Sequence, residues 1–181
     1  MSLFNRSSET HALNLLKLDH QHMDRLFKDY HASGNPVERA RLAGEICQAL
    51  WIHAEMEESV LYPQALNALD ENDDSLVREA AVEHGTLKGL IARICESDVD
   101  DAMFDAHVCV LNEYVRHHVR EEEGELFPKL ERSYLDLEAI GLELLQVKQR
   151  LERGGYSVAM MQSGDVDLLI VSANSGLAHS A

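Results

Sequence analysis

One pattern occurs twice in the chain and constrains its fold more than any other: a histidine followed four residues later by a glutamate. The first copy is His53 with Glu57, and the second is His118 with Glu122. Residues four apart lie on one face of an α-helix, about 6 Å apart along its axis. Each imidazole can therefore point with its carboxylate at one spot, which is an arrangement that metal sites use.

Further residues repeat with nearly the same period as the two copies. Pro63 and Pro128 each lie six residues after a glutamate of the pattern, inside otherwise helical stretches, where we expect kinks and not helix ends. Two more histidines, His20 and His84, are separated by almost the same length of chain. The repeat predicts two helical hairpins, each with two histidines and one glutamate, that face each other across a pseudo-twofold axis.

Apolar residues recur at helical spacing along five segments, and each of the first four carries one of these histidines within its apolar face. The segments are residues 8–31, 36–69, 77–94, 104–126 and, more briefly, 135–152. Asn35 and Pro36 have the residue types of an N-cap and a first helical position, and the acidic residues 70–74 supply a cap for the third segment. Four long helices with brief connections predict an all-α, up-down-up-down four-helix bundle, with the fifth helix capping one end.

The length of 181 residues suits a single domain with a buried core. We assign residues 1–153 to this domain. The helical pattern fails beyond it, so residues 154–181 are expected to form a flexible tail, with a protein partner as one possible use.

Charge and cysteine usage exclude several classes of partner. The chain has 32 acidic and 16 basic residues, a formal charge of −16, which opposes binding to nucleic acid or to an anionic membrane. Cys47, Cys95 and Cys109 are scattered and form no thiolate zinc motif or disulfide framework. No signal peptide and no apolar run of membrane-helix length is visible. We therefore expect a cytoplasmic protein without a membrane partner.

Burying a carboxylate within an apolar face is costly unless it is paired or coordinated, and this chain does so twice, one turn after a buried histidine. A metal site is the favoured interpretation, against a purely structural polar layer that fixes the register of the bundle. Imidazole and carboxylate ligands without thiolate suit iron, manganese or zinc. Bridging carboxylates span the roughly 3.5–4 Å between two ions, so a dinuclear site with open positions for a small ligand is favoured over a mononuclear one.

The pattern resembles the hemerythrin-like HHE cation-binding domain, across residues 13–151. The resemblance implies a four-helix bundle with two non-heme iron ions joined by an oxo or hydroxo bridge. It carries ligand roles onto the six residues that the spacing had already selected, which are His20, His53, Glu57, His84, His118 and Glu122.

Two departures from the oxygen-carrying members bear on function. Lys88 stands where those proteins have a further histidine, and the fourth helix has His118-x3-Glu122 in place of a His-x4-Asp. With one nitrogen ligand fewer, reversible oxygen carriage is disfavoured. A ferritin-like site is disfavoured as well, because no histidine here has a glutamate three residues before it.

Neighbouring residues leave alternatives open. His117 with Glu121 also fits the spacing, but the distance to the following proline favours His118 with Glu122, so we expect His117 to face solvent or to support a ligand. Asp19 and Glu83 each precede a single ligand histidine and either orient that histidine through a hydrogen bond or are solvated. The tyrosines Tyr30, Tyr62 and Tyr114 could relay electrons or hydrogen-bond a bound ligand, but packing is the favoured interpretation.

Two classes of function fit this sequence. The first is a protein that binds or senses oxygen, nitric oxide, peroxide or iron at a diiron centre. The alternative is a diiron enzyme with catalase- or peroxidase-like activity in oxidative or nitrosative stress defence. No dedicated general base, cofactor motif or substrate pocket is visible, so binding is favoured. The sequence does not specify the oligomeric state or the resting redox state.

Overall fold

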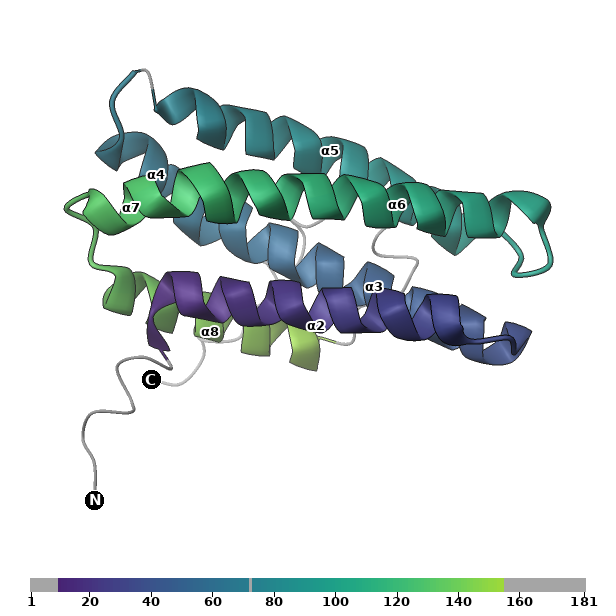
Figure 1. The fold of residues 1–181 in the computed structure, drawn as a ribbon. Coiled ribbons are helices and arrows are strands. Elements are labelled where there is room, and N and C mark those ends of the chain that lie inside the picture. The colour runs from purple at the N-terminus through teal and green to yellow at the C-terminus, as the bar shows by residue number, and fades with distance from the viewer. Residues whose placement is uncertain (1–9, 72, 155–181) are drawn as a thin grey trace, which may run out of the picture.

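The computed structural model describes residues 10–71 and 73–154, and these residues form helices and turns without any strand. The elements in chain order are α2 (Ala12–Ala32), α3 (Pro36–Met56), the π-helical η2 (Glu57–Leu61), α4 (Tyr62–Ala68), α5 (Asp74–Glu96), α6 (Ala102–Glu121), the π-helical η3 (Glu122–Leu126), α7 (Phe127–Arg132) and α8 (Leu137–Arg153). The predicted all-α class is confirmed (Figure 1). The predicted tail, apart from Gly154, and the start of the first helix at residues 8–9 lie outside the described residues.

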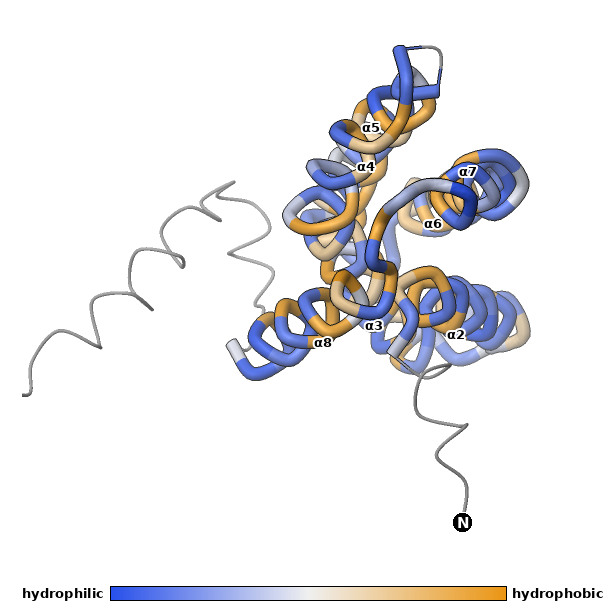
Figure 2. Tube along the Cα trace, turned by 90° about the vertical axis from the view of Figure 1, so that its left-hand side faces the viewer, coloured by the Kyte–Doolittle hydropathy of each residue, from blue (hydrophilic) through white to orange (hydrophobic). Residues whose placement is uncertain are grey.

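Long helices lie side by side in Figure 1, and the turns that join α2 to α3 and α5 to α6 lie at the end opposite the turn that joins α4 to α5. In the view along the helices, the hydrophobic residues lie mainly toward the middle (Figure 2). None of the described helices has the length and apolar character required to cross a membrane.

Local capping explains where several helices begin. The Asn35 side chain accepts hydrogen bonds from the amides of Val37 and Glu38, with Pro36 at the first position, as predicted. Asp101 caps α6 through the Met103 amide. The acidic residues 70–74 are predicted to cap the helix that follows them. The N-cap residue of α5 is Asp73, but its side chain makes no capping hydrogen bond.

Both prolines follow a π-helical turn. Proline has no amide hydrogen, and its ring collides with the carbonyl four residues earlier in a regular α-helix. Here the amides of Tyr62 and Phe127, just before Pro63 and Pro128, bond to the carbonyls of Glu57 and Glu122 five residues back. The wider turn lets the helical path continue past each proline, and it begins in both cases at the glutamate of the repeated pattern.

Two apolar clusters fill the interior, and a polar layer separates them. On α2, Leu13 and Leu16 belong to one cluster, Met23 and Phe27 to the other, and His20 lies between them. On α5 His84 lies between the two clusters in the same order, whereas along α3 and along α6 with η3 the order is reversed and the change occurs near His53 and after His118. Each helix therefore contributes its histidine at one level of the bundle.

Helix α8 does not cap an end of the bundle as predicted. It packs along α2 and α3 (Figures 1 and 2), with Leu137, Ile140 and Leu144 in the cluster that also holds Leu13 and Leu16. The apolar face of α8 is long enough to cover the side of a helix. Packing in this way buries more apolar surface than packing across the end of the bundle would. Helix α8 is thus a flank of the domain that holds the polar layer.

Candidate metal centre

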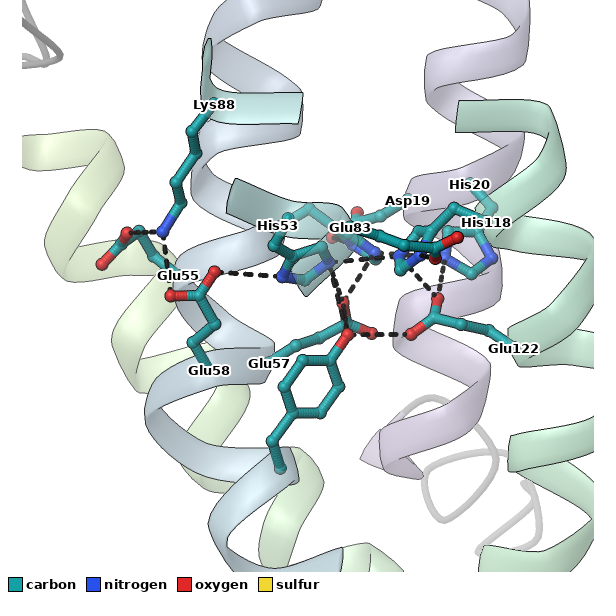
Figure 3. Close-up of polar contacts among 12 residues, drawn as sticks. Asp19, His20, His53, Glu55, Glu57, Glu58, Glu83, Lys88, His118 and Glu122 are labelled. Carbon is teal, nitrogen blue, oxygen red and sulfur yellow. Dashed lines mark hydrogen bonds and ion pairs between the residues drawn. The ribbon is translucent and has the colours of Figure 1, made fainter. Parts of the chain in front are cut away.

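Six buried polar side chains meet in the layer between the apolar clusters, and they are the six that the sequence selected. Helices α2, α3, α5 and α6 each supply one histidine, and the two glutamates begin the π-helical turns. Every one is at most 4% exposed; they are His20, His53, Glu57, His84, His118 and Glu122. Figure 3 shows His20, His53, Glu57, His118 and Glu122 pointing toward one another.

The histidines form two pairs with the same geometry. The Nε2 atoms of His20 and His53 are 3.1 Å apart, and those of His84 and His118 are also 3.1 Å apart. Two imidazoles bound to one ion at about 2.0–2.1 Å would have nitrogens roughly 2.9–3.4 Å apart. Each pair therefore has the separation of two ligands of a single ion.

Each glutamate stands between the two pairs. Glu57 Oε2 lies 3.4 Å from Nε2 of both His53 and His84. Glu122 Oε2 lies 3.3 Å from Nε2 of His20 and 3.5 Å from Nε2 of His118. Because each carboxylate contacts one histidine of each pair, both are placed to bridge two cations.

Carboxylates on the outer side of the layer fix the orientation of three of the histidines. Nδ1 of His20 lies 2.7 Å from Glu123, and Nδ1 of His84 lies 3.1 Å from Glu58. These two acids directly follow Glu122 and Glu57 in the sequence, and our sequence analysis overlooked them, although the repeat holds them at equivalent positions. A carboxylate only accepts hydrogen bonds, so each Nδ1 is the donor, and in the neutral imidazole Nε2 then presents a lone pair.

Asp19 and Glu83 lie beside different histidines from the ones that the sequence predicts. Glu83 Oε2 lies 2.7 Å from Nδ1 of His118, on the neighbouring helix, and not beside its sequence neighbour. Asp19 lies 3.9 Å from Nδ1 of His53 and also pairs with Lys148 of α8. Adjacent residues of a helix point in different directions, so the acid before a histidine reaches the next helix instead.

The donor set fits a bound cation. When His84 and His118 are neutral and both Nδ1 atoms donate to carboxylates, two Nε2 lone pairs face each other at 3.1 Å and repel unless a metal ion or a proton lies between them. Glu57 Oε1 and Glu122 Oε2 are buried and have no hydrogen-bond partner among the described residues. Buried carboxylate oxygens without donors are costly, and a cation satisfies both the oxygens and the lone pairs.

The electrostatics of the layer lead to the same conclusion. Burial lowers the pKa of His20, but Glu122 and Glu123 outweigh it and raise this pKa to about 9. Burial likewise lowers the pKa of His84, which Glu57 and Glu58 raise to about 9. Burial would raise the pKa of Glu122, yet His118 and His20 hold it well below its usual range. The layer thus favours positive charge, whether protons or metal ions.

Tyr62 is a further site residue that the sequence analysis treated as packing. Its hydroxyl lies 3.3 Å from Glu57 Oε2, 3.3 Å from His84 Nε2 and 3.2 Å from Glu122 Oε1. Burial and the two carboxylates raise its pKa well above the ordinary value, so the phenol keeps its proton. Phe127, at the equivalent position of the second repeat, stacks on His20 as Tyr62 stacks on His84, so a hydroxyl is present in one half of the site.

Lys88, at the position of the additional histidine in oxygen carriers, points away from the layer. Its ammonium lies 2.7 Å from Glu55 and 2.9 Å from Glu58, and 5.0 Å from the centre of the Trp51 ring. Figure 3 shows Lys88 beside Glu55 and Glu58. Glu58 also accepts a hydrogen bond from His84 Nδ1, so Lys88 supports His84 indirectly. It therefore supplies no nitrogen ligand to the centre.

The alternative pair, His117 with Glu121, lies at the surface. The His117 side chain is 52% exposed and lies near Glu83 and Glu121, outside the layer. The layer itself is reached from another side, through a groove of about 560 Å³ between α2 and α6. His20 and Glu123 lie in its wall together with Phe27, Val119 and Arg120.

Comparison with known proteins gives a family match and a curated relative. Residues 11–130 match the hemerythrin HHE cation-binding domain. A protein named DNA nickase from Nostoc sp. (strain PCC 7120) is 32% identical over 114 residues, which cover 63% of this chain and 32% of that protein. The chain therefore spans about a third of the length of this relative. No solved structure matches significantly.

The family match runs from the start of α2 into α7 and thus includes all six residues of the buried layer. The motif of the repeat, the buried layer and the family comparison agree, and the chain belongs to the hemerythrin HHE cation-binding domain family.

Proposed function

We propose that this chain is an up-down-up-down bundle that holds two non-heme iron ions and uses them to bind or sense a small ligand. The observation that supports this most directly is the sharing of Glu57 and Glu122 between two histidine pairs. One ion would lie with His20 and His53, the other with His84 and His118, and both carboxylates would bridge. A single ion would leave one of the two histidine pairs, whose nitrogens are 3.1 Å apart, without a cation.

Iron is proposed among the metals that the donor set admits. Four imidazoles and two carboxylates suit iron, manganese and zinc, and bound iron would supply redox chemistry and open positions for oxygen, nitric oxide or peroxide. The residues of the chain orient the imidazoles, keep Glu122 ionised and exclude bulk water from the layer.

The groove between α2 and α6 supports a small ligand as the binding partner. It reaches His20 on one side of the centre, whereas Glu58, bound by Lys88, backs His84 on the other. A diatomic molecule or peroxide would therefore arrive beside the His20 and His53 pair. Phe27 and Val119 give part of the groove an apolar lining.

The test is the metal content per chain and the optical spectrum of protein purified in air, before and after addition of nitric oxide or peroxide. Two irons per chain and near-ultraviolet absorption that changes with the ligand are expected. One zinc per chain, or a metal-free protein with a featureless spectrum, would contradict the proposal.

Tyr62 favours a second candidate, a peroxide-consuming enzyme. A protonated phenol that contacts both carboxylates and His84 can donate a proton beside a reacting ligand. Under this candidate, Tyr62→Phe lowers peroxide turnover by roughly 10-fold or more with unchanged iron content, and Tyr114→Phe leaves turnover unchanged. Wild-type turnover no faster than that of free iron would exclude the enzyme and leave the binding function.

The activity named for the Nostoc relative is outside this proposal. The similar region is about a third of that protein, and the formal charge of −16 in the present chain opposes contact with a nucleic acid backbone.

A further inference from the structure

A second group of metal-type side chains lies at the surface, one carboxylate away from the buried layer. His117 Nε2 is 3.2 Å from Glu121 Oε1 and 3.7 Å from Glu83 Oε1. One ligand atom from each of the three residues lies within 4.8 Å of the others. Ligands of a tetrahedral ion with bonds of about 2.1 Å are roughly 3.4 Å apart, so the three side chains need only small adjustments to hold one ion.

Glu83 belongs to both groups. Its Oε2 accepts the hydrogen bond from His118 Nδ1, and its Oε1 faces His117. The side chain is 11% exposed, so its outer oxygen lies at the boundary between the interior and solvent. One carboxylate thus links the surface cluster to a ligand of the buried centre.

A small cavity is lined by residues of both the surface cluster and the buried centre. Glu79, Glu83 and Glu121 line it together with His118 and Glu122. Its volume of about 10 Å³ is close to that of one water molecule or one small ion. Glu122, 1% exposed, has an oxygen without a hydrogen-bond partner and lines this cavity from the inside.

The internal repeat shows that the surface cluster exists in one half of the molecule only. When the two copies of the repeat are aligned, the positions of His117 and Glu121 correspond to Ile52 and Met56. These two are buried in the apolar cluster that includes Ile140 of α8. Helix α8 therefore covers this face in the first half, and the second half presents a histidine and a glutamate there instead.

We propose that Glu83, His117 and Glu121 form an outer site for a divalent cation and that this site loads the buried centre. The ion exchanges with solvent at His117 and Glu121, which are 52% and 39% exposed, and passes inward along the carboxylates of Glu83 and Glu122. Binding at the outer site is independent of the proposed iron function, whereas the loading role depends on it.

The test uses the full chain, stripped of metal by a chelator and dialysed against Zn²⁺, followed by metal analysis. Wild-type protein is expected to bind three ions, of which two resist a brief chelator treatment and one is removed. His117→Ala and Glu121→Gln are expected to bind the third ion at least about 10-fold more weakly and to keep the other two. His22→Ala, an exposed histidine outside the cluster, is the control and should behave as wild type.

The loading role is tested by the rate at which metal-free protein takes up Zn²⁺ from a coloured indicator. Both cluster variants are expected to fill the two retained positions about 10-fold more slowly while reaching the same final content. A third ion of unchanged affinity in His117→Ala, or none in the wild type, overturns the outer site, and equal uptake rates overturn its loading role. Loss of the two retained ions in both variants would instead contradict the ligand set proposed for the centre.

Discussion

At the scale of single residues, the two ring nitrogens of a buried histidine contact different groups. Nδ1 donates to an outer acid, and Nε2 faces the centre, as at His84 with Glu58 and at His118 with Glu83. The spacing of the sequence predicts which imidazoles face inward, because helical periodicity fixes direction. It does not predict which outer acid orients each ring, since that depends on how neighbouring helices are aligned along their axes.

Removal of one of the two buried carboxylates should test the proposed ligand set. Glu57→Ala is expected to lose at least one metal ion per chain and to unfold at lower denaturant concentration, because the facing histidines lose their shared counter-charge. Glu45→Ala, at an exposed glutamate on the preceding helix α3, should retain both ions. Metal analysis and urea unfolding of the two variants provide the measurement, and full metal content in Glu57→Ala would contradict the assignment.

The pKa of Tyr30 predicts a loss of stability at alkaline pH. Burial and Asp105, which accepts the phenolic hydrogen bond at 2.6 Å, raise this pKa to about 12. The folded protein then holds the proton more tightly than the unfolded chain, whose tyrosine has a pKa near 10. The stabilisation is complete below about pH 10 and is lost as the pH rises toward about 12.

The urea midpoint of wild-type protein is therefore expected to fall across this interval, and that of Tyr30→Phe to fall less. Parallel curves for the two proteins would show that Tyr30 contributes nothing to the pH dependence.

At the scale of elements, the π-helical turns and α8 determine how the ligands are presented. The sequence predicts an irregularity at Pro63 and Pro128, because proline cannot continue a regular α-helix undisturbed. The wider turn that begins at Glu57 and at Glu122 appears only in the structure. The position of α8 was predicted wrongly, since an amphipathic pattern shows that a face is buried but not against which partner.

The close contact between α8 and the start of α2 gives a prediction at this scale. A Cβ atom at Gly141 would lie 1.7 Å from the carbonyl oxygen of Thr10 and 2.9 Å from the amide nitrogen of Ala12. Gly141→Ala is therefore expected to destabilise the protein by about 1–3 kcal/mol, because backbone must shift to relieve the overlap.

The matched control is Gly89→Ala, on the exposed face of α5, where a Cβ meets nothing within 4 Å. It should stabilise the protein by about 0.5–1 kcal/mol, since alanine favours the helix. Denaturant unfolding of both variants tests the pair, and equal stabilities would show that α8 can move away from Thr10 without cost.

At the scale of the whole molecule, the buried layer divides the apolar interior into two clusters. It places six ionisable groups where apolar side chains would otherwise meet, so without a cation the layer weakens the core that surrounds it. Folding and metal binding are therefore expected to be coupled.

Removal of metal by a chelator should lower the thermal unfolding midpoint. An ion that binds only the folded state and is present at 1,000 times its Kd stabilises that state by about 4 kcal/mol, which corresponds to roughly 10 °C for a domain of this size. Thermal unfolding with and without chelator, followed by addition of Fe²⁺ to restore the midpoint, is the measurement. An unchanged midpoint would favour a purely structural polar layer.

The sequence by itself determined the all-α class, most helix limits and the six residues of the buried layer. These follow from helical periodicity and from the internal repeat, both of which can be read within the chain without knowledge of its packing. Only the tertiary structure decided the roles of Tyr62 and Glu123, the position of α8 and the outer cluster at His117. Each of these depends on contacts between helices that are distant in the sequence, and such contacts are set by packing geometry, which periodicity does not encode.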